Sequence, residues 1–174
     1  IHIYTGSDDY YSNVLAPHQT ERALRNCQAL IDNVRFNQKI DHPIYIAYDE
    51  WNVWFRAREP QTALEEQYTL VDALAVATYL NSFVRHCNTV KMANLAQLVN
   101  VIAPIFTNKE GLFLQTIYYP LRLFSEHVRG TALDVFVECE MYSLDAATEP
   151  EPWSRRISDL GPFKLLDVTA TLHE

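Results

Sequence analysis

Ile44-Tyr-Ile-Ala-Tyr-Asp-Glu-Trp-Asn-Val-Trp-Phe55 is the most informative segment of this chain. Its first five residues are rich in β-branched and aromatic side chains, which is typical of a buried strand, and two acids follow them directly. Parallel strands of α/β proteins present their catalytic and ligand-binding groups at the carboxyl end. Glu50, wedged between aromatic residues, is therefore the first candidate for chemistry. The alternative is that Asp49 and Glu50 only solvate the end of a strand.

The segments around this stretch alternate between strand and helix patterns. Residues 1–4 show the period-2 alternation of a strand, and Gly6 to Asn13 read as a polar, aromatic loop. A helix is predicted over residues 20–34, with Ala23, Leu24, Cys27, Leu30, Ile31 and Val34 as one apolar stripe facing a core. A second helix is expected to start in a capping box formed by Thr62 and Glu65 and to run to about His86, before a strand from Val90. This order predicts βαβ units with a parallel sheet.

The character of the chain changes near residues 130–134. Before that point, Thr116 is expected to cap a helix over residues 117–128. After it, residues 135–141 and 165–172 alternate between apolar and other side chains, separated by a Pro- and acid-rich loop at 145–152. Such alternation is typical of half-buried antiparallel strands. The chain is therefore expected to divide into an α/β part, 1–130, and a β part, 131–174.

Composition excludes several classes of function. The chain has 174 residues, of which 48% are hydrophobic, and a net charge of −8 without a basic patch, which argues against nucleic acid and anionic membranes as partners. No window reaches 18 apolar residues, so no membrane span is predicted. Three scattered cysteines are expected to be reduced, buried thiols of a cytoplasmic protein. The chain begins without Met in a strand-like run and stops in another, so it is expected to be part of a longer protein.

Motifs for metal, nucleotide and acyl-transfer chemistry are absent from the sequence. The six histidines show no His-x-x-x-His spacing, the four glycines form no phosphate loop, and there is no Gly-x-Ser-x-Gly elbow. We therefore expect neither a metal nor another cofactor.

Polar and aromatic residues accompany the end of each predicted parallel strand. These sets are His2 and Tyr4; Glu50, Asn52 and Trp54; and Asn94 and Gln97. Because successive parallel strands end on one face, the sets are expected to converge in one pocket. Aromatic faces pack on the C–H surfaces of sugars, amides bond their hydroxyls, and a carboxylate attacks or stabilises an oxocarbenium-like centre. The convergence favours a sugar-processing site, although His2 taken alone is more often structural.

At these residues the chain resembles the glycoside hydrolase family 51 α-L-arabinofuranosidases. The resemblance spans nearly the whole chain and lies in Tyr48-Asp-Glu-Trp-Asn-Val-Trp-Phe55, Ala96-Gln-Leu-Val-Asn-Val-Ile-Ala-Pro-Ile105, Gln115-Thr-Ile-Tyr-Tyr-Pro120, His2-x-Tyr4 and Leu166-Asp-Val-Thr-Ala170. It implies the C-terminal portion of a (β/α)8 TIM barrel for residues 1–130, followed by the beginning of an antiparallel β-sandwich of jelly-roll type for 131–174.

The resemblance also assigns roles to individual residues. It implies that Glu50 is the nucleophile of a retaining mechanism, that His2 and Tyr4 line its site, and that Tyr4 holds or orients the nucleophile. Gln97 is expected to contact the arabinose and Trp54 to form an aromatic wall, whereas the role of Asn52 stays open. The implied enzyme is cytoplasmic and releases terminal arabinofuranose from arabinan, arabinoxylan or their oligosaccharides, and it forms homo-oligomers.

One departure from the family limits what this chain does alone. The acid/base glutamate of the family lies in an Asn-Glu pair, and no Asn-Glu dipeptide occurs here. A retaining enzyme needs both carboxyl groups about 5–5.5 Å apart, so the chain is expected to be inactive without the remainder of the enzyme. Two alternatives remain open: a non-catalytic sugar-binding or assembly fragment, and a related retaining glycosidase acting on glucan or xylan.

Overall fold

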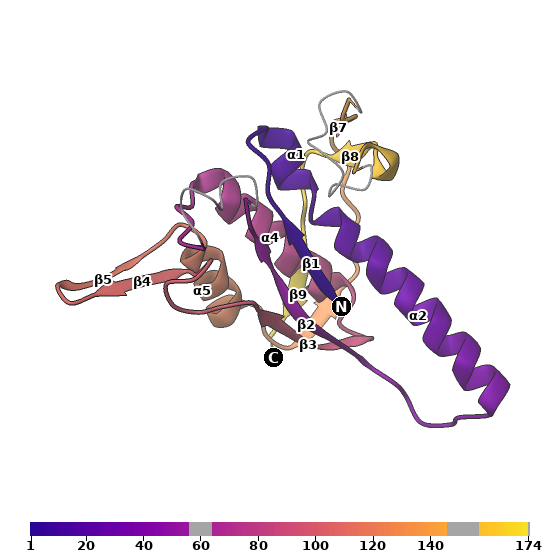
Figure 1. The fold of residues 1–174 in the computed structure, drawn as a ribbon. Coiled ribbons are helices and arrows are strands. Elements are labelled where there is room, and N and C mark those ends of the chain that lie inside the picture. The colour runs from indigo at the N-terminus through magenta and orange to yellow at the C-terminus, as the bar shows by residue number, and fades with distance from the viewer. Residues whose placement is uncertain (56–63, 146–156, 174) are drawn as a thin grey trace.

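A three-stranded parallel sheet lies at the centre of the computed structural model, which describes residues 1–55, 64–145 and 157–173 (Figure 1). Its strands, in spatial order, are β1 (His2–Thr5), β2 (Ile46–Val53) and β3 (Val90–Leu95). Both pairs of neighbours are parallel, with α2 connecting β1 to β2 and α4 lying between β2 and β3 in the chain. The predicted strand–helix–strand order is thus confirmed.

The helices differ from prediction mainly at their ends. They are α1 (Tyr10–Leu15), α2 (His18–Gln38), α4 (Leu70–Arg85), α5 (Tyr118–His127) and the 3-10 helix η3 (Ile157–Leu160). The short α1 lies where a loop was expected, because the Asp9 side chain accepts from the Ser12 backbone N at 2.8 Å and begins a helix there. No helix within the described ranges combines the length and the apolar composition needed to span a membrane.

Helix α4 begins later than the sequence suggested. Residues 65–69 are not helical, so the predicted start at the Thr62–Glu65 box is wrong, and Thr62 itself lies outside the described residues. The box that forms is Thr69 with Asp72, whose Oδ2 accepts from the Thr69 backbone N at 2.6 Å. Thr116 does not cap α5 either, because its hydroxyl donates to the Thr69 carbonyl at 2.6 Å instead.

The main core lies between the sheet and α4. Trp51 of β2 packs against Tyr79 and Phe83 of α4, with ring centroids 5.1 and 5.2 Å apart, and Tyr48 contacts Phe83 as well. These aromatic side chains are buried, as expected for a helix that is apolar nearly all round. Burial of each such ring is worth roughly 1.5–3 kcal/mol, so this contact is a major source of the stability of the sheet.

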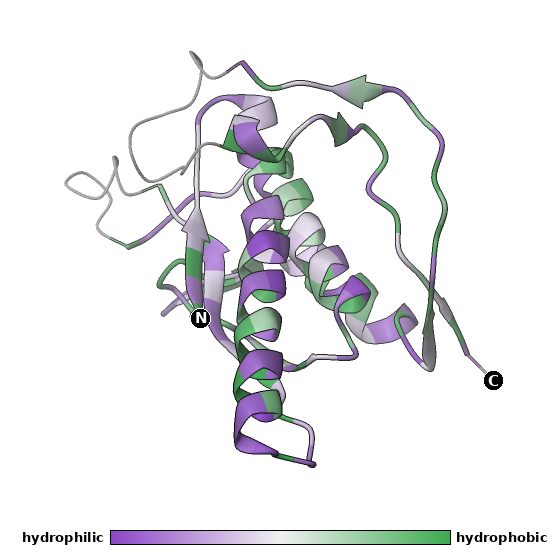
Figure 2. Cartoon of the chain, turned by 90° about the vertical axis from the view of Figure 1, so that its right-hand side faces the viewer, coloured by the Kyte–Doolittle hydropathy of each residue, from purple (hydrophilic) through white to green (hydrophobic). Residues whose placement is uncertain are grey.

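Helix α2 contributes only its first half to this core. Leu24 is fully buried, and Cys27 and Ile31 pack partly against the sheet, but Leu30, Val34 and Phe36 are exposed. The prediction of one continuous buried stripe is therefore wrong for Leu30 and Val34, because the helix runs out past the sheet (Figure 1). In Figure 2, where α2 is in front, apolar residues stand among hydrophilic ones along its outward side.

The described chain after β3 also contains short antiparallel strand pairs. They are β4 (Ile105–Asn108) with β5 (Gly111–Leu114), β6 (Thr131–Leu133) with β9 (Ala170–Leu172), and β7 (Met141–Tyr142) with β8 (Phe163–Lys164). Antiparallel pairing after residue 130 is confirmed, but the long strands predicted over 135–141 and 165–172 are wrong, since residues 134–140 and 165–169 have no regular structure. Val135 and Met141 of the apolar side remain 39% and 50% exposed, so the alternating pattern finds no second layer there to bury that side.

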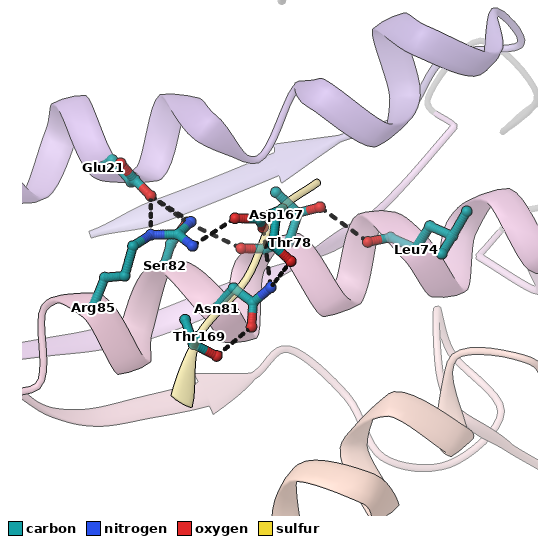
Figure 3. A network of polar contacts seen from close by, with 8 residues as sticks. All are labelled: Glu21, Leu74, Thr78, Asn81, Ser82, Arg85, Asp167 and Thr169. Atoms are coloured by element: carbon teal, nitrogen blue, oxygen red, sulfur yellow. Dashed lines mark hydrogen bonds and ion pairs between the residues drawn. The ribbon is translucent and has the colours of Figure 1, made fainter. Parts of the chain in front are cut away.

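A polar network ties the segment before β9 to the helices (Figure 3). Arg85 of α4 donates to Asp167 at 2.5 Å and to Glu21 of α2 at 2.7 Å. Asn81 donates to the carboxylate and to the carbonyl of Asp167, both at 3.1 Å, and accepts from the Thr169 hydroxyl at 2.7 Å. Burial alone would raise the pKa of Glu21, but the charge and hydrogen bond of Arg85 outweigh it and lower that pKa. We call these five residues the Arg85 network.

Candidate active site

The candidate nucleophile is held by two side chains of the neighbouring strand. The register of β1 with β2 places His2 opposite Glu50 and Tyr4 opposite Asn52. The Tyr4 hydroxyl donates to Oε1 of Glu50, and His2 Nδ1 lies 3.4 Å from Oε2. Each carboxylate oxygen thus has its own partner, while 39% of the side chain remains exposed. A carboxylate fixed on two sides and open to solvent is arranged to meet a ligand.

Glu50 lies within β2 rather than at its end. The strand continues for three residues beyond it, to Val53, which corrects the expectation that the strand stops at the acids. The pairing with β3 is irregular here, because Tyr48 pairs with Ala93 whereas Trp51 pairs with Leu95, so three steps on β2 match two on β3. Bulges of this kind are common beside active sites, where they re-aim a side chain.

Asp49, the other acid of the pair, contacts His2. Its Oδ2 lies 3.1 Å from His2 Nε2. His2 therefore bridges two carboxylates, one on each ring nitrogen, and this fixes the orientation of its ring.

Trp54 contacts Tyr4 through its ring. The centroids are 5.4 Å apart and the planes meet at 75°, an edge-to-face contact. The Trp54 backbone N donates to the Thr5 carbonyl at 2.6 Å, which brings the ends of β1 and β2 together. Gly6 permits this approach, because a Cβ there would stand only 2.5 Å from the Trp54 carbonyl oxygen.

The two amides of the predicted set behave differently. Gln97 is exposed and follows β3, and within the described part of the chain no hydrogen bond joins it to His2, Tyr4, Glu50 or Trp54. Its backbone neighbour Ala96 donates to the Trp51 carbonyl at 3.1 Å, so the chain at Gln97 starts beside β2. Asn52 is fully buried and donates to the Ile102 carbonyl at 2.5 Å, so it faces protein rather than the open side of the site.

Buried polar residues that the sequence reasoning missed support these strand ends. The Glu66 carboxylate accepts from the Phe55 backbone N at 2.9 Å, and the Tyr68 hydroxyl donates to the Val53 carbonyl at 2.8 Å. Tyr79 donates to Thr5 Oγ1 at 3.2 Å, and burial raises the pKa of this phenol well above its ordinary value. None of these residues carries a motif; only their burial identifies them.

The arrangement suits a reaction at a sugar carbon. A carboxylate with a phenol donor on one oxygen and an imidazole at the other is held in place for attack, and Trp54 packs against the ring of that phenol, Tyr4. Among residues 1–55, 64–145 and 157–173, no group of three His, Cys, Asp or Glu side chains is placed to hold a metal ion. Cys27, Cys87 and Cys139 are free thiols. They are half-buried, whereas the sequence predicts buried thiols.

Comparison with family models gives a match over most of the chain. Residues 49–173 match the model described as the α-L-arabinofuranosidase C-terminal domain. The match begins one residue before Glu50 and includes α4, α5 and the antiparallel pairs.

Individual relatives extend the similarity to the first 48 residues. The chain is 45% identical over 178 residues to a protein named probable α-L-arabinofuranosidase C from Aspergillus niger, covering all of this chain and 34% of that protein. It is 38% identical over 155 residues to the intracellular exo-α-(1→5)-L-arabinofuranosidase of Halalkalibacterium halodurans, covering 82% of this chain and 31% of that protein. The chain thus spans about a third of the length of the curated relatives that it matches.

A solved structure shows the same arrangement of the chain. The α-L-arabinofuranosidase of Thermotoga maritima, solved as an arabinose complex, superposes with a TM-score of 0.72 at 38% identity, over 82% of this chain and 29% of that one.

Proposed function

Because this chain belongs to the α-L-arabinofuranosidase C-terminal domain family, we propose that it is part of a retaining glycoside hydrolase that releases terminal non-reducing α-L-arabinofuranosyl residues. The substrates are arabinan, arabinoxylan or arabino-oligosaccharides. The names of the relatives support this activity. The net charge of −8 also suits an uncharged sugar substrate better than a negatively charged polymer.

The contact of Glu50 with Tyr4 and His2 is the observation that carries the proposal. In the proposed reaction, Glu50 attacks the anomeric carbon, the bond to the leaving oxygen breaks, and an acid/base group outside this chain protonates that oxygen. Water activated by the same acid/base group then hydrolyses the glycosyl ester and frees Glu50. Tyr4 donates to one carboxylate oxygen of Glu50 in the resting site and keeps the group oriented, and the other oxygen, 3.4 Å from His2 Nδ1, is the one that attacks.

Three further residues are proposed to bind the sugar. His2 and Trp54 flank Glu50 and Tyr4, and Trp54 supplies an aromatic wall for the C–H face of the ring. Gln97 follows the neighbouring strand and is exposed, so its amide is accessible to a sugar hydroxyl.

We propose that a preceding segment of the whole enzyme completes the fold. Residues 1–130 would form the last strands of a (β/α)8 barrel and residues 131–174 the start of a jelly-roll sandwich. The parallel order β1–β2–β3 and the exposed apolar half of α2 support this reading, since both are suited to further barrel strands and helices. A homo-oligomer is also proposed. A cytoplasmic location is supported by the relative named as intracellular and by the three free thiols.

Replacement of Glu50 in the complete enzyme tests the proposal. Glu50→Gln should lower turnover of an aryl α-L-arabinofuranoside by several powers of ten, because the covalent route is lost. Glu126→Gln, which changes an exposed glutamate on α5, is the matched control and should retain full turnover. Turnover of the Glu50 variant within tenfold of the parent enzyme would refute the assignment.

A second candidate is a non-catalytic sugar-binding fragment, favoured by the absence of any Asn-Glu dipeptide from the chain. Titration calorimetry with arabinose, combined with an activity assay, separates the two. Binding by the complete protein without hydrolysis would support the binding function, and release of glucose or xylose instead of arabinose would identify a glucan or xylan glycosidase.

A further inference from the structure

The loop that follows β3 contains an unfavourable backbone conformation. Ile102 has φ +38° although it is β-branched, and it is only 5% exposed. β-Branched residues rarely adopt positive φ. This conformation costs roughly 1–3 kcal/mol and persists only where surrounding contacts enforce it. Two residues earlier, Asn100 also has positive φ, at +65°. The path of the chain between Gln97 and Ile105 is therefore imposed by its contacts.

Asn52 supplies the main contact at Ile102. Its Nδ2 donates to the Ile102 carbonyl at 2.5 Å, and its Oδ1 accepts from the backbone N of Val53 at 2.8 Å. The Ile102 N donates to the Leu64 carbonyl at 2.7 Å, which fixes the other side of the same residue. Since Asn52 is fully buried, both bonds are shielded from water, and losing either would leave an unpaired buried group.

Gln115 holds the next two residues of the loop. Its Nε2 donates to the Ala103 carbonyl at 2.8 Å and to the Glu66 carbonyl at 3.1 Å, and its backbone N donates to the Pro104 carbonyl at 2.8 Å. Two buried amides therefore fix three successive carbonyls at the end of the loop. The hydrogen bond from the Ala96 backbone N to the Trp51 carbonyl fixes the start of the loop. Gln97 and the residues after it therefore lie between this bond and the contacts at Ile102.

Both anchors of this loop connect to the strand that carries Glu50. Asn52 stands two residues after Glu50, on the same side of β2, and pairs with Tyr4 in the β1 register. Trp51, the next residue after Glu50, anchors the other end of the loop. Gln97 is thereby placed with reference to Glu50 through the backbone of β2, without any direct contact between them.

We propose that Asn52 is a positioning residue of the sugar site, which sets the place of Gln97 relative to Glu50 by holding Ile102 in its strained conformation. The inference rests on the proposed function, in which Gln97 contacts the sugar bound at Glu50. Asn52 itself does not touch the sugar, because its buried side chain is engaged with the Ile102 carbonyl and the Val53 amide. Small displacements of such contacts cost up to about 100-fold in rate.

A double-mutant cycle in the complete enzyme tests the proposal. Asn52→Ala removes the hydrogen bond to Ile102 and should lower kcat/KM for an aryl arabinofuranoside by about 10- to 100-fold, measured well below the unfolding transition. Gln97→Ala should cause a loss of similar size. Because both act through the same contact, the double variant should be no worse than Gln97→Ala alone. Asn52→Asp, which keeps the shape and the acceptor for Val53 but not the donor, serves if the alanine variant does not fold.

The matched control is Asn13→Ala, which removes an equally buried amide from α1, where Nδ2 donates to Asp72 at 2.8 Å. It should lower thermal stability yet leave kcat/KM unchanged. Amide hydrogen exchange should accelerate over residues 99–105 in the Asn52 variants and not in the control.

The outcomes distinguish this inference from the function on which it rests. If Gln97→Ala leaves kcat/KM unchanged, the sugar-binding assignment of Gln97 fails and the positioning role fails with it. If Gln97→Ala is impaired but the losses in the double variant multiply, or if Asn52→Ala changes stability without changing kcat/KM, the site stands and only the role of Asn52 is overturned.

Discussion

Arg85 Nη1 donates to Asp167 Oδ1 at 2.5 Å, joining two residues that are 82 positions apart in the chain. The contact links α4, whose other face packs on the strand of Glu50, to the segment leading into β9. The same guanidinium also binds Glu21 of α2. One side chain therefore couples three segments of the chain.

Replacing Arg85 with Gln should destabilise the protein. Glu21 and Asp167 would lose their shared counterion while still half-buried, and we expect a loss of about 1–3 kcal/mol in the free energy of unfolding, between the values for exposed and fully buried pairs. Hydrogen exchange over residues 165–172 should also accelerate. Arg122→Gln, which breaks the fully exposed pair with Glu126, is the control and should leave the denaturation midpoint unchanged. Equal effects of the two changes would show that the Arg85 network contributes nothing.

The stability should fall as the pH drops below about 6.5, because of His18. Burial lowers the pKa of this imidazole, although the carboxylates of Asp167 and Glu21 oppose the shift. The unfolded chain, whose histidine keeps the ordinary value of 6.5, then binds more protons than the folded one. Stability is therefore complete above pH 6.5 and is lost as the pH falls through the folded pKa. Glu21, whose pKa is lowered from 4.5, adds a further loss below that value.

Thermal unfolding of His18→Gln measures this effect. Its Tm should depend less steeply on pH between 7 and 5 than the Tm of the parent protein. His86, whose pKa is also lowered by burial, should retain part of the slope. The exposed His127 provides the control, and His127→Gln should show the parent slope. An unchanged slope in His18→Gln would contradict the expectation.

Tyr4→Phe should impair turnover without affecting the fold. The change deletes the hydroxyl that donates to Glu50 but keeps the ring against Trp54, so we expect kcat/KM of the complete enzyme to fall about 10- to 100-fold at an unchanged Tm. Tyr119→Phe, which removes a hydroxyl from an exposed ring on α5, should have no effect on either quantity. Parent-like kinetics in Tyr4→Phe would mean that its contact with Glu50 does not contribute to the reaction.

Gly6→Ala should disturb both stability and activity. Its methyl group would meet the Trp54 carbonyl oxygen at 2.5 Å and push apart the ends of β1 and β2, at a cost of about 1–3 kcal/mol. Tyr4 and Trp54 should move with those ends, so kcat/KM should fall as well. Ser7→Ala, at the next position, removes only a local hydrogen bond from Asp9 N and should be nearly neutral. Unchanged stability and kcat/KM in Gly6→Ala would show that the ends of β1 and β2 accommodate the methyl group without cost.

The exposed apolar half of α2 should make the isolated chain associate. Leu30 and Phe36 are 66% and 84% exposed, which is unusual for side chains of this size on a helix. Light scattering should detect oligomers of the isolated 174-residue chain. The double change Leu30→Lys and Phe36→Lys should reduce them, whereas the same double change at the polar, exposed positions Asn33 and Asn37 should not. A monodisperse monomer of the parent chain would contradict this prediction.

The fold could be predicted where one local pattern dominates. The apolar runs of β2 and α4 and the helical stripe of α2 identify those elements, because periodicity is a property of consecutive residues. The start of α4 could not be predicted, since Thr62–Glu65 and Thr69–Asp72 match the same capping pattern and tertiary contacts choose the second. The alternation over 135–141 failed for a similar reason, because a strand forms only where a partner strand lies alongside it.

The candidate site was only partly predictable. The motif around Glu50 predicted a carboxylate among aromatic rings, and the structure brings His2 and Tyr4 to it, with Trp54 packed against the Tyr4 ring. The irregular pairing at Asp49 and Glu50 depends on β3, which lies 40 residues away, so the stretch itself carries no sign of it. The role of Asn52 likewise depends on a carbonyl 50 positions later in the chain.

The irregular pairing of β2 also restricts how this segment can change in length during evolution. Against β1, every residue from Glu50 to Val53 has one partner, whereas against β3 the strand carries one residue more between Tyr48 and Trp51 and one fewer between Ile46 and Ala47. Deleting one residue between Tyr48 and Trp51 would regularise that part of the pairing with β3 but shift the following residues by one position against β1, placing Trp51 opposite His2, where Glu50 now lies. A single deletion at this point does not satisfy both neighbours. We therefore expect natural variation here to consist of substitutions alone.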